Sequence, residues 1–156
     1  AGAIYNHFPT KQDLLYELLQ VHMETLLEAW AEADAPDLAP PRALEHFVRF
    51  HIRYHLARSR EVFISYMELR NLEDANFGAI EALRRKYESV PRAILERGSR
   101  DGSFDIMDPQ VTTMAIIAML NGMTTWYRDN GRLSLDEIEA LYVRLVARLV
   151  GQKKED

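Results

Sequence analysis

The sequence has 156 residues, of which 47% are hydrophobic and 28% charged, with no cysteine. This length fits one domain with a sizeable core, and the composition excludes a disordered or collagen-like chain. Without cysteine there is no disulfide framework, thiolate zinc site or thiol nucleophile, and a reducing, cytoplasmic location is allowed. The formal net charge of −5 means that any contact with nucleic acid is confined to a small basic part of the protein.

Neither a membrane span nor a signal peptide is expected. The longest uninterrupted apolar run, Met114–Leu120, is much shorter than the roughly 20 residues that cross a bilayer. The first residues show no basic segment followed by an apolar one. The sequence therefore predicts a soluble protein.

Helix caps and helix breakers are frequent along the chain, whereas strand patterns and internal repeats are not found. The opening segment Ala1–His7 is expected to end a short helix before Pro9. Thr10, followed by Asp13 three positions later, indicates a capping-box start for a long helix. Six helices are predicted, over residues 11–34, 41–58, 61–72, 75–98, 109–128 and 135–150. The fold class is therefore all-α.

The fifth predicted helix carries no charge from Pro109 to Tyr127. A helix that is apolar on all sides is buried on all sides, and the last helix also has two apolar stripes. We expect the two helices to form an isologous homodimer interface, closed as a four-helix bundle; the alternative is that both are central in a monomer. The predicted interface residues are Ile117, Leu120, Thr124, Tyr127, Leu141, Leu145 and Leu149.

No enzyme signature is present. The chain has no G-x-S-x-G elbow, no glycine-rich phosphate loop and no HExxH zinc motif. His51 and His55 lie four residues apart on the apolar side of their helix, so we expect hydrogen-bonded histidines rather than metal ligands. The sequence predicts no catalytic residue, no metal and no cofactor.

The middle helices are rich in aromatic side chains that lie beside polar ones. This combination is typical of a small-molecule cavity with a few polar anchors, although a plain core explains it equally well. The candidate ligand-binding residues are Phe47, Phe50, His51, Tyr54, His55, Tyr66, Met67, Arg70, Arg84, Tyr87, Asn121 and Trp126.

The N-terminal segment offers side chains that suit DNA. Lys11 at a helix start suits a phosphate, and Tyr5 and His7 can donate to phosphates or base edges. The pattern formed by Tyr5, His7, Phe8, Thr10, Lys11 and Leu14 resembles the end of the helix-turn-helix of TetR-family transcriptional regulators. By this resemblance, the DNA-binding candidates are Ala3, Tyr5, Asn6, His7 and Lys11.

The resemblance also implies an organisation. Residues 1–10 would be the C-terminal remnant of the helix-turn-helix domain, and residues 11–156 the ligand-binding and dimerisation domain. In the family about two and a half more helices precede this point, so we expect the sequence to be a truncated piece.

The implied function is that of a repressor. A homodimer would bind operator DNA and be released by a small hydrophobic effector. The segment Trp126–Gly131 is similar to one in regulators of lipid or acyl catabolism that respond to acyl-CoA thioesters, and Arg70, Arg84 or Arg128 would then meet the phosphates. The alternatives are a helical carrier protein that does not bind DNA and a purely structural dimerisation module.

Overall fold

The computed structural model describes residues 10–152, so the predicted DNA-binding residues Ala3, Tyr5, Asn6 and His7 lie outside the described part. Within that range the chain forms six α-helices and one 3₁₀ turn, with no β-strand. The prediction of an all-α fold is confirmed. The elements are α2 (Lys11–Ala33), α3 (Pro40–Ala57), α4 (Ser59–Glu68), η1 (Leu69–Asn71), α5 (Asp74–Asp101), α6 (Pro109–Trp126) and α7 (Leu135–Leu149).

The helix starts follow from local sequence. Thr10 and Asp13 form a reciprocal capping box at α2, and Ser134 and Glu137 form another at α7. Asp108 caps α6 by accepting from the Val111 amide at 2.9 Å. Each cap gives a partner to an amide that the first turn leaves unpaired.

Helix α5 continues through an internal proline and extends three residues past the predicted end. It stops at Gly102, which takes the left-handed conformation with φ 81° that glycine adopts without strain. Gly98 lies inside the helix, and its lack of a side chain leaves room for the ring of Phe104, which packs where a Cβ would be. The predicted third helix over 61–72 is in fact α4 followed by η1.

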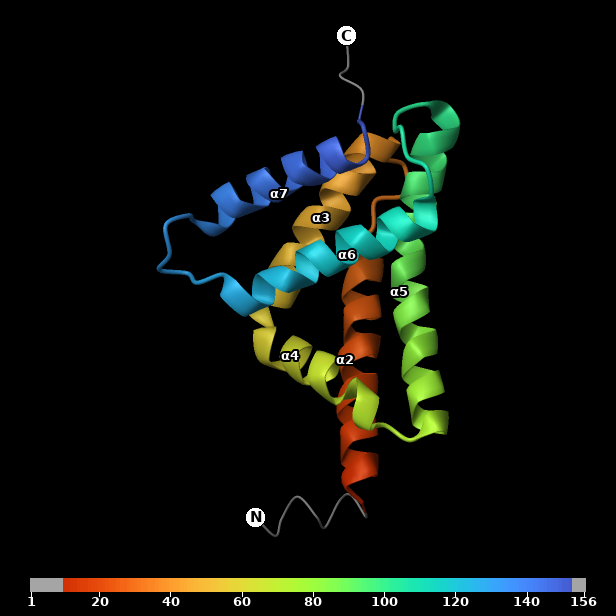
Figure 1. Cartoon of the computed structure of the whole chain (residues 1–156), viewed down its shortest axis with the longest axis vertical. Helices are drawn as coiled ribbons and strands as arrows, with labels where there is room; N and C mark the ends of the chain where they lie inside the picture. The colour runs from red at the N-terminus through yellow and green to blue at the C-terminus, as the bar shows by residue number, and fades with distance from the viewer. Residues whose placement is uncertain (1–9, 153–156) are drawn as a thin grey trace.

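Helix α3 lies at the centre of the bundle (Figure 1). The long helices α2 and α5 lie side by side, α6 packs on both α5 and α3, and α7 packs on α3. Helix α3 contacts each of the other five α-helices and carries the fully buried Phe47 and Ile52. No helix in residues 10–152 is long and apolar enough to cross a membrane.

Candidate ligand cavity and dimerisation face

A cavity lies where five helices meet. Its volume is about 50 Å³, which is room for only a few non-hydrogen atoms. The lining combines apolar side chains with several polar ones, which is the usual construction of a small-molecule site. The lining residues are His22, Met23 and Leu26 of α2, His51 and His55 of α3, Val62, Ser65 and Tyr66 of α4, Arg84, Tyr87 and Glu88 of α5, and Ile117 and Asn121 of α6.

Hydrogen bonds link four of the lining side chains into one chain. The Tyr87 hydroxyl lies 3.0 Å from Nδ1 of His51, and Nε2 of the same ring lies 2.9 Å from Oδ1 of Asn121. The Asn121 amide donates to the Tyr66 hydroxyl at 2.6 Å. With the Asn121 oxygen facing it, His51 donates from Nε2 and accepts from Tyr87 at Nδ1. Both ring nitrogens of His51 are therefore occupied.

His51 and His55 of α3 stack on each other and are neutral at pH 7. Their ring centroids are 3.7 Å apart, and the ring planes are nearly parallel. Burial lowers the pKa of His51 to about 4, against a smaller opposing effect of the Asn121 hydrogen bond. Burial, and then the neighbouring His51, lower the pKa of His55 well below its usual value. Burial likewise lowers the pKa of His22, so this part of the cavity wall is polar but uncharged.

Charged groups belong to a different part of the lining. Arg84 lies over the Tyr66 ring at 5.6 Å and approaches Glu81 at 3.8 Å. Burial raises the pKa of Glu88 one turn further along α5. Among residues 10–152 no cluster of histidine and carboxylate side chains has the geometry to hold a metal ion.

The structure brings together only part of the predicted ligand set. His51, His55, Tyr66, Arg84, Tyr87 and Asn121 all line the cavity. Phe47, Phe50, Tyr54, Met67, Arg70 and Trp126 do not. Sequence analysis missed His22, Ser65 and Glu88, since helical spacing alone does not say which face of α2, α4 or α5 meets the neighbouring helices.

The predicted ligand-binding residues that do not line the cavity lie in the core, on the surface or in another pocket. The Phe47 ring lies in the core at 5.5 Å from Trp30, and Phe50 stacks on Tyr54 at 5.7 Å. The buried Tyr54 hydroxyl has no hydrogen-bond partner within the described residues. Met67 is 59% exposed. Two more lie on the surface: Arg70 is exposed, and Trp126 lines a separate pocket beside Tyr127 and Arg128.

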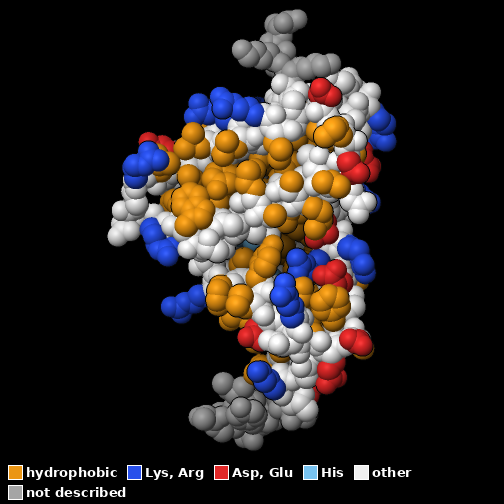
Figure 2. Space-filling model, viewed as in Figure 1, with side chains coloured by type: hydrophobic (Ala, Val, Ile, Leu, Met, Phe, Trp, Pro, Cys, Tyr) orange, Lys and Arg blue, Asp and Glu red, His pale blue; other side chains and the backbone are white. Residues whose placement is uncertain are grey.

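A second feature is an exposed apolar face on α6 and α7. Figure 2 shows hydrophobic side chains gathered over these two helices. Leu141, Leu145 and Leu149 of the predicted interface are exposed there. Ile117 and Leu120 are instead buried within the chain, at 7% and 1% exposure, because that side of α6 packs on the core. The outward side of α6 carries Val111, Met114 and Trp126, while Thr124 and Tyr127 are partly buried.

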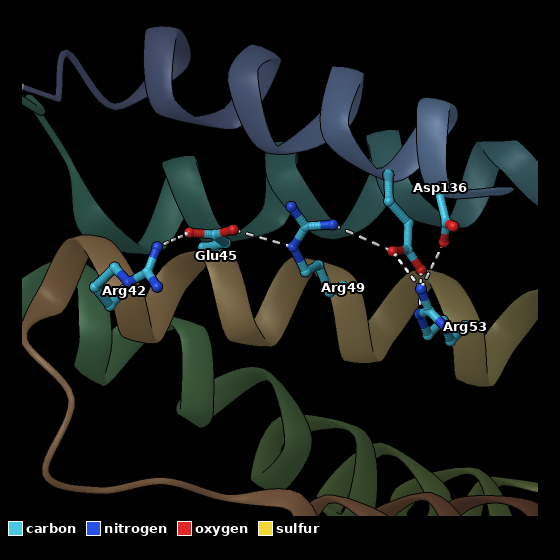
Figure 3. A network of polar contacts seen from close by, with 6 residues as sticks. Arg42, Glu45, Arg49, Arg53 and Asp136 are labelled. Atoms are coloured by element: carbon cyan, nitrogen blue, oxygen red, sulfur yellow. Dashed lines mark hydrogen bonds and ion pairs between the residues drawn. The ribbon is translucent and has the colours of Figure 1, made fainter.

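Helices α3 and α7 are joined by ion pairs from Arg49 and Arg53 to Glu139, which we call the polar clamp (Figure 3). Glu139 of α7 is fully buried and accepts from Arg49 at 3.2 Å and Arg53 at 2.9 Å. Arg53 also binds Asp136, and Arg49 also binds Glu45. The clamp lies along the face of α3 that meets α7, whereas His51 and His55 line the cavity.

At the N-terminal end of α2, Lys11 is exposed at the first helical position.

A wider groove of about 600 Å³ runs between α3 and α7. Its lining includes the surface side chains Arg42, Arg144 and Arg148 and none of the histidines. The histidine cavity is therefore the better candidate for a ligand site, since five helices converge there on a connected set of polar groups.

A helical chain with an internal polar cavity and an apolar two-helix face has the organisation of a ligand-binding regulatory domain. The chain belongs to the TetR family: residues 37–150, most of its length, match the family model described as "Tetracyclin repressor-like, C-terminal domain".

Among its relatives is the HTH-type transcriptional repressor KstR2 of Rhodococcus jostii strain RHA1. The two are 24% identical over 94% of this chain and 72% of the relative. A solved tetR-family regulatory protein from Rhodococcus RHA1 is 30% identical, with a TM-score of 0.90 over 98% of this chain and 80% of that chain. AibR, solved with isovaleryl coenzyme A and operator DNA, is 23% identical, with a TM-score of 0.82 over 96% and 80%. KstR2 is thus a transcriptional repressor by name, and the Rhodococcus structure is that of a regulatory protein.

Proposed function

We propose that this chain is the ligand-binding and dimerisation part of a cytoplasmic transcriptional repressor that leaves operator DNA when an acyl-CoA thioester enters the histidine cavity. The observation that carries this proposal is the position of the cavity against α2. His22, Met23 and Leu26, near the middle of that helix, line it. By its resemblance to the TetR family, we expect DNA to be bound by the segment that ends at Lys11, at the start of the same helix.

A ligand would act by moving α2. The helix has 23 residues and is about 34 Å long at 1.5 Å per residue. Side chains near its middle face the cavity, so a molecule larger than the present space has to displace them or α4. In a dimer, displacing two such helices changes the separation of two recognition helices, which must match successive major grooves. The shift in DNA affinity can be no larger than the ligand's differential affinity for the two states.

The choice of effector rests on two supports. AibR, which has the same fold, was solved with isovaleryl coenzyme A, and a short acyl group suits the small cavity here. Arg84, on the cavity lining, is placed to meet a phosphate of the coenzyme. The dimer itself is supported by the apolar face formed by Leu141, Leu145 and Leu149 with the outward side of α6.

The test uses protein expressed from the complete reading frame. We expect a dimer by light scattering, binding to a DNA fragment from upstream of its own gene, and release of that fragment by isovaleryl coenzyme A. Free coenzyme A serves as the control and should be less effective. A monomer, or a dimer that retains DNA at saturating thioester, would contradict the proposal. Thioester binding without DNA binding would instead support the carrier alternative.

A further inference from the structure

Of the two ring nitrogens of His55, only Nδ1 makes a hydrogen bond with the described residues. Its Nδ1 lies 2.9 Å from the backbone oxygen of His51. A carbonyl oxygen only accepts, so Nδ1 carries a hydrogen and donates it. Burial and the neighbouring His51 hold the pKa of His55 well below its usual value, and the ring is neutral at pH 7. A neutral imidazole with hydrogen on Nδ1 has a lone pair on Nε2.

That lone pair has no hydrogen-bond partner among residues 10–152, although His55 is a lining residue of the cavity. The adjacent His51 differs, since Tyr87 and Asn121 occupy both of its nitrogens. Nε2 is not among the fully buried atoms that lack a partner, so it is accessible from the cavity, and a ligand that displaces water from it without offering a donor loses free energy. Nε2 of His55 is thus the acceptor that the cavity leaves for a ligand.

The surroundings keep His55 an acceptor. Its ring stacks at 3.7 Å on His51, and the nearby His22 and Arg58 also lower its pKa, so adding a proton to His55 is unfavourable. A ligand carboxylate placed here would face the lone pair and be repelled. An alkyl end would leave the lone pair unpaired, whereas a hydroxyl would donate to it.

We propose that the cavity selects a short acyl thioester whose buried end carries a hydroxyl, and that this hydroxyl donates to Nε2 of His55. This inference rests on the proposed function, because it names the acyl group of the thioester effector. The Ser65 and Tyr66 hydroxyls, which line the same cavity, are placed to donate to the ligand's remaining oxygen atoms. His55 is then the residue that discriminates between acyl groups of equal length.

The first measurement compares three probes by calorimetry at pH 7: butyryl-, 3-hydroxybutyryl- and succinyl-coenzyme A. They share the coenzyme and differ at the acyl end. We expect the hydroxyacyl thioester to bind about tenfold more tightly than butyryl-coenzyme A, the size of one buried hydrogen bond. Succinyl-coenzyme A should bind most weakly.

The matched variants are His55→Phe and His46→Phe. His55→Phe keeps a flat ring but removes the acceptor, so the tenfold preference should disappear while butyryl-coenzyme A still binds. His46 lies outside the cavity, with Nε2 on the Ala33 carbonyl at 2.7 Å, and its variant should keep the preference. A preference that survives His55→Phe overturns the inference.

Nitrogen NMR of the wild-type protein supplies a readout that does not depend on a stable variant. The His55 ring should show hydrogen on Nδ1 and an unprotonated Nε2 whose signal shifts when 3-hydroxybutyryl-coenzyme A is added. A proton on Nε2 overturns the inference. Equal affinity for all three probes overturns the inference alone, and absence of binding by any thioester overturns the proposed effector class and the inference with it.

Discussion

In the polar clamp between α3 and α7, the carboxylate and the two arginines differ in how far they are exposed to solvent. The Glu139 carboxylate is fully buried, while the Arg49 and Arg53 side chains are 38% and 56% exposed. Removing both arginines leaves a buried charge without a partner. Removing the carboxylate leaves two guanidinium groups that water can solvate. We therefore expect the double variant Arg49→Met/Arg53→Met to lose much more stability than Glu139→Gln.

The magnitudes follow from this difference in burial. An uncompensated buried charge costs about 3 to 5 kcal/mol, and we expect the double arginine variant to lose about 3 kcal/mol because water can reach Glu139 once the arginines are gone. Glu139→Gln keeps its size and hydrogen-bonding oxygen and should lose about 1 kcal/mol. The triple variant with Glu139→Met as well should return close to wild type, since an apolar replacement of a buried ion pair is often neutral.

Urea unfolding at pH 7 measures these free energies, at one fixed protein concentration because the stability of the proposed dimer would depend on concentration. Arg42→Met is the matched control: Arg42 pairs with Glu45 at 2.9 Å on the surface, and its loss should cost less than about 1 kcal/mol. If Glu139→Gln destabilises the protein as much as the double arginine variant, the reasoning from unequal burial is refuted.

Three further predictions test the site and the interface. Leu145→Glu puts a charge on the exposed apolar face, and sedimentation should find a monomer; a stable dimer would place the interface elsewhere. The pKa of His51 is about 4 in the folded protein against 6.5 in the unfolded chain. Its contribution to stability is therefore complete above pH 6.5 and falls by about 3 kcal/mol as the pH is lowered to 4. His51→Gln should flatten this part of a profile of urea stability against pH, and an unchanged slope would contradict the low pKa. Ser65→Leu fills the cavity and should weaken isovaleryl-coenzyme A binding at least about tenfold by calorimetry, whereas Met67→Trp, on an exposed side chain, should not; equal effects would argue against this cavity as the site.

The starts of α2 and α7 could be predicted because their causes are local. Thr10 with Asp13, and Ser134 with Glu137, are separated by three residues, and the capping geometry involves nothing else. Long-range partners are different. Sequence alone gave no reason to single out Glu139, because Arg49 lies 90 residues away from it.

Face assignments failed for a related reason. Helix α6 is apolar on every side, so it has no periodic stripe to indicate that Leu120 faces inward and Met114 outward. On α4, Tyr66 lines the cavity but Met67 does not, since one residue is a rotation of about 100° around a helix axis. Only the packing of the neighbouring helices determines which of two adjacent side chains enters the cavity.

Helix α3 connects the cavity to α7 through its own side chains. His51 and His55 face the ligand space, while Arg49 and Arg53 bind Glu139 on α7, the helix that presents Leu145. A ligand that shifts α3 therefore acts on the exposed apolar face of α6 and α7 as well as on α2. Because α3 packs on every other α-helix, it does not adjust continuously within a close-packed core. In the dimer that we propose, a ligand that moves α3 would change the relative free energies of whole arrangements of the two chains, which is how the proposed repressor would respond to an effector.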